Sequence, residues 1–196
     1  SHLVPDLLDA FICELRAIKK VRDEMGLKNL NIMLPFVRTI EEVQEITAMM
    51  DEIGLKRGTT LKLYLMAEVP VNIFMAEEFC QYCDSFSIGS NDLTQLVLGV
   101  DRDSDVLGRM GYFDERNEGV KRAIRQLIEV AHRNGRTVGI CGQGPSVYPE
   151  FAEFLVECGI DSISLNPDTV VKTKRSIASV EQRLMLRQLR ELSSRN

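Results

Sequence analysis

The sequence alternates short apolar runs with longer amphipathic segments, and this alternation restricts the fold more than any other feature. Five runs have the length of a strand, are continuously apolar rather than alternating, and precede a polar or glycine-containing turn: residues 31–36, 61–67, 85–89, 137–141 and 162–165. Continuous apolar runs are typical of parallel strands that lie between two layers of helices. We therefore expect an α/β fold whose strands are parallel and buried between helices.

Helical patterns separate the five runs. Thr39-Ile40-Glu41-Glu42 has the form of a capping box, and apolar residues then recur at helical spacing until Gly54. A second amphipathic helix is expected from about Glu118 to a stop at Gly135. Further helices are expected over residues 3–25, 73–83, 151–158 and 177–192. The order of elements is thus a helix followed by repeated β-α units.

Repeated β-α units with parallel strands suit either a doubly wound sheet or part of a (β/α)₈ barrel, and both place functional side chains at the carboxyl ends of the strands. A full barrel has eight strands in about 250 residues, whereas this chain has 196 residues. If the fold is a barrel, roughly three strands are absent. The chain begins at Ser1 without a methionine, so we expect the natural protein to extend upstream.

Composition and charge exclude several classes of function. A formal net charge of −5 argues against a general nucleic-acid binder. No apolar stretch is long enough to span a bilayer and no signal peptide opens the chain, so we expect a cytoplasmic protein without membrane contact. The five cysteines are expected to be reduced thiols. Cys80 and Cys83 form a C-x-x-C pair, which we interpret as one apolar helix face because the chain has too few further ligands for a zinc site.

Several polar residues stand at the carboxyl ends of the predicted strands. Glu68 follows the second run, Asp92 comes shortly after the third, and Cys141 ends the fourth. Two carboxylates on neighbouring strand ends suit Mg²⁺, although each could instead cap a helix. Cys141 is either a small buried thiol or a group held out for chemistry.

The connection between the third run and the helix near Glu118 holds roughly thirty residues, which is far above the usual loop length. It is rich in charged and amide side chains, and we interpret it as a functional loop. Arg102 within it could bind a phosphate or carboxylate, or be a solvated charge. Gly89 and Gly142 could present backbone N–H groups to an anion, or be ordinary turn glycines.

Longer motifs carry a resemblance to a known family. "MLPFVRT", "GSNDLTQLVLGVDRDS", "FDERN", "GICGQGPS" and "GIDSISLNPDTVV" occur in this order, and Glu68 stands in Met-x-Glu-x-Pro. They resemble the phosphoenolpyruvate-utilising enzymes, from the opening helix to about Val171. They are most similar to the branch that converts ATP, pyruvate and water to phosphoenolpyruvate, AMP and phosphate, since other branches tend to have an acidic residue where Gln143 stands.

The resemblance implies that residues 1–196 form the C-terminal, substrate-binding part of a TIM-type (β/α)₈ barrel, with about five of its eight strands. It implies a Mg²⁺ ion bound by Glu68 and Asp92, and Cys141 as the proton donor to a Mg²⁺-stabilised pyruvate enolate. The residues implied to contact pyruvate or phosphoenolpyruvate are Glu68, Gly89, Ser90, Asn91, Asp92 and Arg102.

The resemblance also implies parts that this sequence lacks. The family draws its phosphoryl group from a phosphohistidine on a mobile domain fed by an ATP-binding domain, and uses arginines from the first barrel strands. We therefore expect an inactive fragment that binds substrate weakly at best and whose open sheet edges either pair in a homo-oligomer or are covered by a helix. Val147 stands where this branch has an acidic residue, which leaves the role of that loop open. Alternatives are a pyruvate phosphate dikinase, a Mg²⁺-dependent lyase of pyruvate-like acids, or a non-catalytic pyruvate-binding module.

Overall fold

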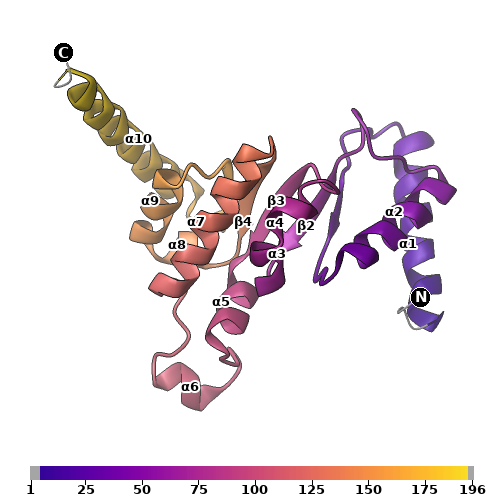
Figure 1. Cartoon of the computed structure of the whole chain (residues 1–196), viewed down its shortest axis with the longest axis horizontal. Helices are drawn as coiled ribbons and strands as arrows, with labels where there is room; N and C mark the ends of the chain where they lie inside the picture. The colour runs from indigo at the N-terminus through magenta and orange to yellow at the C-terminus, as the bar shows by residue number, and fades with distance from the viewer. Residues whose placement is uncertain (1–4, 194–196) are drawn as a thin grey trace.

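The computed structural model describes residues 5–193 (Figure 1). Its strands are β1 (Ile32–Leu34), β2 (Leu63–Ala67), β3 (Ser85–Gly89), β4 (Thr137–Cys141) and β5 (Ser162–Ile163). Its helices are α1 (Pro5–Asp23), α2 (Ile40–Ile53), α3 (Pro70–Phe74), α4 (Ala76–Phe79), α5 (Ser90–Leu98), α6 (Asp105–Arg109), α7 (Glu118–Arg133), α8 (Gly144–Val147), α9 (Pro149–Glu157) and α10 (Val170–Ser193). Within this part of the chain, no helix is long and apolar enough to cross a membrane.

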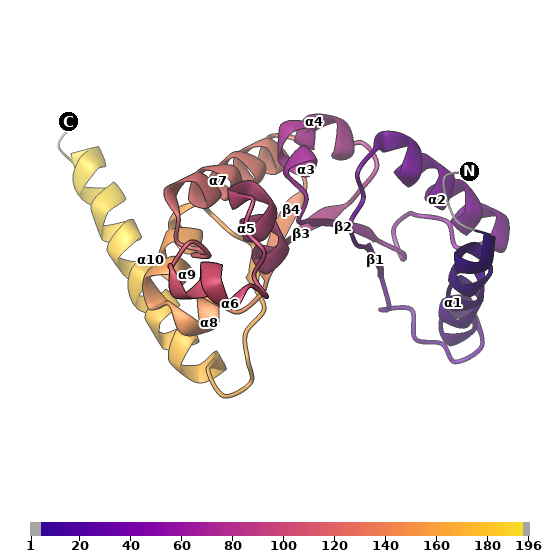
Figure 2. The same ribbon diagram turned by 90° about the horizontal axis from the view of Figure 1, so that it is seen from below.

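The five strands form one parallel sheet in the order β1-β2-β3-β4-β5, which confirms the predicted α/β class. Consecutive strands are neighbours throughout, as in a barrel and unlike a doubly wound sheet, whose strand order reverses. Figure 2 shows the sheet within an arch, with α2, α3, α4 and α7 along its outer side and α1 and α10 at its two ends. The architecture is therefore part of a TIM-type barrel.

Among residues 5–193, helices cover only one face of the sheet (Figure 2), so the expectation that the strands are buried between helices is wrong. The helix-facing side chains of β2, such as Leu63 and Leu65, are fully buried, as are Phe86 and Ile88 of β3. The alternate residues of β2 are half-buried, which gives an alternating burial pattern. The alternate residues point to the opposite face, where large side chains on β1 and β2 give way to small ones on β3, β4 and β5. These residues pair across the sheet: Met33, Tyr64, Met66, Ser85, Ser87, Thr137, Gly139, Cys141 and Ser162. In a barrel this face is the interior.

The capped helices follow their sequence signals. The Thr39 hydroxyl accepts the Glu42 N–H, and the Glu42 carboxylate accepts the Thr39 N–H, so the capping box is confirmed. Gly54 ends α2 in the left-handed conformation, with a φ of 90°. In α7 the predicted inward residues, including Val120 and Ile124, are fully buried.

Other helices depart from expectation. The helix expected over 73–83 is two short helices, α3 and α4, that meet at Met75. The last helix begins at Val170 rather than near residue 177. The opening helix spans Pro5–Asp23, and the first residues of its expected range lie outside the described part of the chain.

The long connection after β3 is not an irregular loop. The chain enters α5 at Ser90, directly after β3 ends at Gly89, and α6 follows at Asp105. The residues expected to be loop ligands, Ser90, Asn91 and Asp92, therefore form the first turn of α5. A helix start holds these side chains more rigidly than a loop would.

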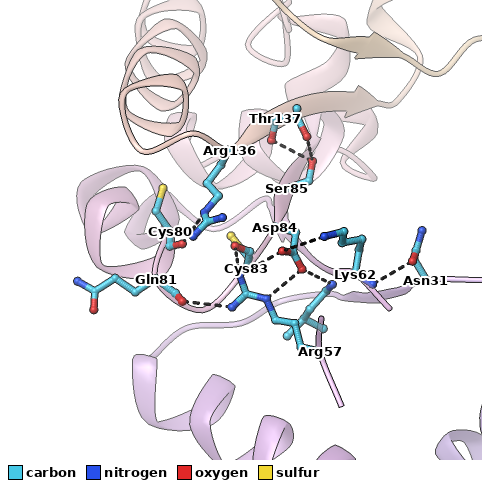
Figure 3. A network of polar contacts seen from close by, with 11 residues as sticks. Asn31, Arg57, Lys62, Cys80, Gln81, Cys83, Asp84, Ser85, Arg136 and Thr137 are labelled. Carbon is cyan, nitrogen blue, oxygen red and sulfur yellow. Dashed lines mark hydrogen bonds and ion pairs between the residues drawn. The ribbon is translucent and has the colours of Figure 1, made fainter. Parts of the chain in front are cut away.

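A polar network ties the amino ends of the strands together, at the edge of the sheet opposite to Cys141 (Figure 3). Asp84, just before β3, accepts the Leu63 N–H of β2 at 2.9 Å and the Arg57 Nε–H at 2.9 Å. Arg57 also donates to the carbonyls of Gln81 and Cys83. The network fixes the register of β2 and β3 by charge-assisted hydrogen bonds.

Candidate active site

The sequence-predicted residues meet at the carboxyl ends of β2, β3 and β4. Ala67 pairs with Ile88, and Gly89 pairs with Cys141, so Glu68, Gly89 and Cys141 follow one another across three neighbouring strands. Because the strands are parallel, these ends lie at one edge of the sheet. The grouping inferred from strand order is present in the structure.

Glu68 is a buried carboxylate, with a relative exposure of 2%. Its Oε1 accepts the N–H of Phe36 at 2.8 Å, and a Cβ placed on Gly89 would lie 2.6 Å from its Oε2. Burial raises the pKa of Glu68, the Phe36 N–H lowers it, and the charge of Asp92 raises it further. Glu68 therefore stands over Gly89, with Asp92 near enough for the two charges to oppose each other.

This pair of carboxylates fits a hard divalent cation. Two like charges held together favour a cation between them, and all their donor atoms are oxygens, which Mg²⁺ prefers. Among residues 5–193, no group of three or more His, Cys, Asp or Glu side chains could hold a metal. Mg²⁺ commonly uses one or two carboxylates, with water and substrate oxygens completing the shell. Glu68 and Asp92 suit that arrangement.

Arg102 reaches the same site from the turn after α5. Its Nη2 lies 3.8 Å from Asp92 Oδ1, and its backbone N–H donates to Gln95 Oε1 at 3.1 Å. The side chain is 40% exposed, so the guanidinium can also contact a bound anion. Asn91, which precedes Asp92 in the first turn of α5, is half-buried.

Cys141 is half-exposed at the end of β4 and differs from the other thiols of the core. Its Sγ accepts a weak hydrogen bond from Ser87 Oγ at 3.7 Å. Burial raises the pKa of Cys80 and raises that of Cys83 to about 12, which makes both thiols inert. The pair is apolar and buried as expected, but it does not form a helix face, because α4 ends at Phe79 and both cysteines follow it. Among these three, Cys141 alone faces the uncovered interior side of the sheet.

Ser90 and Glu115 form a pair that the sequence did not predict. Ser90 is fully buried, and its hydroxyl donates to Glu115 Oε1, so its side chain is turned away from solvent. Any contact of Ser90 with substrate would therefore use its backbone N–H, which is free of intrahelical partners in the first turn of a helix. Glu115 is 5% exposed and comes from "FDERN". The motif was noticed, but nothing local distinguishes Glu115 from its exposed neighbours.

Val147, whose loop the sequence left open, and the histidine His132 are both surface residues. Val147, at the end of α8, is 55% exposed. His132 lies on the surface at the end of α7, where its Nε2 is 2.9 Å from Asp161 Oδ2. His132 is therefore not a residue of the strand-end site.

The partial TIM-type barrel with carboxylates at its strand ends is the architecture of a barrel enzyme. Comparison with known sequences shows the family to which the chain belongs. Residues 3–182 match the family described as "PEP-utilising enzyme, PEP-binding domain", and the chain belongs to this family. More particularly, it is 59% identical over 194 residues to a phosphoenolpyruvate synthase of Aeropyrum pernix, covering 99% of this chain and 24% of that protein. It is 56% identical over 191 residues to a probable phosphoenolpyruvate synthase of Staphylothermus marinus, covering 97% of this chain and 23% of that protein.

The chain thus spans about a quarter of the length of the curated relatives it matches. Among solved structures, it resembles a citrate lyase of Burkholderia xenovorans with a TM-score of 0.54 and 19% sequence identity, over 76% of this chain and 48% of that one. At this identity the likeness concerns the fold alone, and it agrees with a partial TIM-type barrel.

Proposed function

We propose that this chain is the carboxyl-terminal, pyruvate- and phosphoenolpyruvate-binding domain of an enzyme that converts ATP, pyruvate and water to phosphoenolpyruvate, AMP and phosphate. The observation that carries the proposal is the meeting of Glu68, Asp92 and Cys141 at three neighbouring strand ends, in a chain more than half identical to phosphoenolpyruvate synthases. The whole of residues 1–196 would form this one domain.

The proposed site binds a small keto acid by charge. Glu68 and Asp92 would hold Mg²⁺, which when bound supplies a Lewis acid for negative charge on substrate oxygens. Arg102 can pair with a carboxylate or phosphoryl group because its guanidinium is half-exposed beside Asp92. Backbone N–H groups in the first turn of α5 have no partners within the helix and would favour an anion there.

Cys141 would carry the proton in this reaction. In the direction of synthesis, its thiolate takes a proton from the pyruvate methyl group, and the C–H electron pair becomes the C=C bond of the enolate. The enolate oxygen then accepts the phosphoryl group from the donor. In the reverse direction, the thiol returns the proton to carbon. Cys141 is a general acid and base here and forms no covalent bond with substrate.

The phosphoryl donor and the ATP-binding step would come from other parts of the full-length protein, as would arginines that neutralise the substrate. We also propose that the full-length enzyme is cytoplasmic and that it is a homo-oligomer. Support for an oligomer concerns the isolated chain: β1 and β5 each pair on one side only within residues 5–193, so their free edges could pair with another copy.

Replacement of Cys141 by serine in the full-length protein tests the proposal. Because an alcohol is a far weaker acid than a thiol, Mg²⁺-dependent exchange of pyruvate methyl hydrogens with solvent should fall by about 10²–10⁴-fold. Phosphorylation of the upstream histidine by ATP should be unchanged. Equal loss of both half-reactions would instead indicate a structural cysteine, and Cys158→Ser, a change of another half-buried thiol, is the matched control.

A further inference from the structure

Glu115 is a buried acid without a cationic partner. Its side chain is 5% exposed, and within the described residues no lysine or arginine forms an ion pair with it. Its carboxylate accepts a hydrogen bond from the hydroxyl of Ser90, a residue of the first turn of α5. A polar group is costly to bury unless it makes a specific contact, so the position of Glu115 requires an explanation.

The loop that follows Cys141 is shaped around this acid and its partner. A Cβ on Gly144 would lie 2.9 Å from the Glu115 carboxylate carbon and from both of its oxygens. A Cβ on Gly142 would collide with the Ser90 hydroxyl. The two glycines of Gly142-Gln143-Gly144 therefore let Ser90 and Glu115 pack directly against the backbone that leaves the cysteine.

The neighbouring residue Arg116 contacts the same segment further along the chain. The Arg116 guanidinium lies over the Tyr148 ring, 4.1 Å from its centroid, and its Nη1 donates to Glu150 Oε1 at 3.1 Å. Asp114 fixes the Arg116 side chain through its Nε–H at 3.0 Å. Residues 114–116 thus contact both the start of α5 and the chain from 144 to 150.

We propose that Glu115 is a positioning residue for the proton step: it sets the place of Cys141 relative to Asn91 and Asp92. Ser90 is the residue immediately before Asn91, and Gly142 is the residue immediately after Cys141, so the Ser90–Glu115 pair lies between the two halves of the site. This inference rests on the proposed function, because it concerns the transfer of a proton between Cys141 and a substrate bound beside Asp92.

The consequence of losing Glu115 follows from geometry. Without the carboxylate, a space opens beside Gly144 and the Ser90 hydroxyl loses its acceptor, so the cysteine loop and the start of α5 can shift relative to each other. Glu68, Asp92 and Arg102 keep their own contacts, so substrate binding should persist. A displacement of about 1 Å can cost about 10²-fold in rate when it separates reacting groups.

Three variants of the full-length protein test this inference. Glu115→Ala removes the acid. Glu115→Gln keeps its size and an oxygen that can accept the Ser90 O–H. Asp103→Asn makes the same charge change at an exposed position in the same connection and serves as the control. Each is assayed for the rate and KM of Mg²⁺-dependent exchange of pyruvate methyl hydrogens with solvent, and for phosphorylation of the upstream histidine by ATP.

Glu115→Ala is expected to lower the maximal exchange rate by about 10²-fold with an unchanged KM for pyruvate and unchanged histidine phosphorylation. Glu115→Gln should restore most of the rate, and Asp103→Asn should behave as the wild type. If Glu115→Ala does not fold, Ser90→Ala, which removes the donor, should reproduce the loss of rate. If the wild type catalyses the exchange and Glu115→Ala or Ser90→Ala is equally active, this inference alone is overturned. The same holds if Glu115→Ala loses both the exchange of pyruvate hydrogens and the phosphorylation of the histidine. A wild type without any exchange would overturn the proposed function and this inference together.

Discussion

Replacing Asp84 by asparagine removes the negative charge on which the amino-terminal edge of the sheet depends (Figure 3). Asp84 accepts hydrogen bonds from the Leu63 N–H and from Arg57 Nε–H, each at 2.9 Å, with Lys62 Nζ at 3.9 Å. The Asp84 and Arg57 side chains are only 17% and 23% exposed. Solvent therefore screens this ion pair less than an ordinary surface pair.

The size of the effect follows from these contacts. A hydrogen bond to a charged group contributes about 1.5–3 kcal/mol, and asparagine keeps one oxygen acceptor but presents an amide group on its other side. We expect the free energy of local opening around β2 to fall by about 2 kcal/mol. This corresponds to roughly thirtyfold faster hydrogen exchange at the Leu63 amide, since about 1.4 kcal/mol equals a factor of ten.

The effect should depend on pH in a defined direction. Burial raises the pKa of Asp84, but the Arg57 and Leu63 hydrogen bonds outweigh it, so the pKa in the folded protein is below its usual value. A carboxylate with a lowered pKa stabilises the fold fully above the unfolded pKa, about 3.9, and loses this contribution as the pH falls through the folded pKa. The difference between wild type and Asp84→Asn should therefore be full at neutral pH and shrink below about pH 4.

Hydrogen exchange of the peptide containing Leu63, compared between variants at each pH, measures this effect in the full-length protein. Lys62→Met is the comparison variant, because Lys62 is 41% exposed and its Nζ lies 3.9 Å from Asp84, too far for a hydrogen bond, and it should change local stability by less than about 0.5 kcal/mol. Equal exchange in Asp84→Asn and wild type at neutral pH would refute the reasoning, and so would an equal effect of Lys62→Met. Exchange of pyruvate methyl hydrogens should be unaffected, because Asp84 lies at the opposite end of the strands from Cys141.

Two further predictions concern the site and the isolated chain. Gly89→Ala is compatible with the local φ of −83°, but its Cβ would lie 2.6 Å from Glu68 Oε2. We therefore expect the Mg²⁺ concentration for half-maximal exchange of pyruvate methyl hydrogens to rise about tenfold. Gly58→Ala is the control, because a Cβ there meets nothing within 4 Å. The 196-residue chain alone, incubated with ATP, Mg²⁺ and pyruvate, should form no phosphoenolpyruvate, because the phosphoryl donor is expected elsewhere in the protein. Turnover at about 1 s⁻¹ or faster would contradict this.

Sequence patterns predicted the strands well where the strand is central and less well at the edges. β3 and β4 have the predicted bounds, and the central strand β2 ends as predicted at Ala67 but begins at Leu63 rather than at residue 61. The first run, expected over 31–36, shortens to Ile32–Leu34 because Pro35 lacks an N–H and Phe36 has a positive φ of 50°. β5 is also shorter than expected and is likewise an edge strand.

Properties that depend on distant parts of the chain could not be predicted locally. The apolar runs did not reveal that one face of the sheet is uncovered, because Met66 and Cys141 are as apolar as residues that contact helices. The sequence indicated a helix near Asp92 only as an alternative in which Asp92 caps it, and the start of α5 at Ser90 was missed because Gly89 passes directly into Ser90 without a side-chain cap. Glu115 was missed because its partner, Ser90, is 25 residues away in the sequence.

The glycines beside Cys141 show how such long-range contacts change the interpretation of a local motif. From the sequence, Gly142 was either a turn glycine or a place for an anion to approach the backbone. In the structure its φ is 131°, which disfavours other residues, and a side chain there would collide with Ser90. Gly142 is therefore needed for contact with another part of the same protein. Because the same contact joins the cysteine loop to the turn that carries Asn91 and Asp92, a substitution at Gly142 should impair the proton step even though Gly142 has no side chain to offer a substrate.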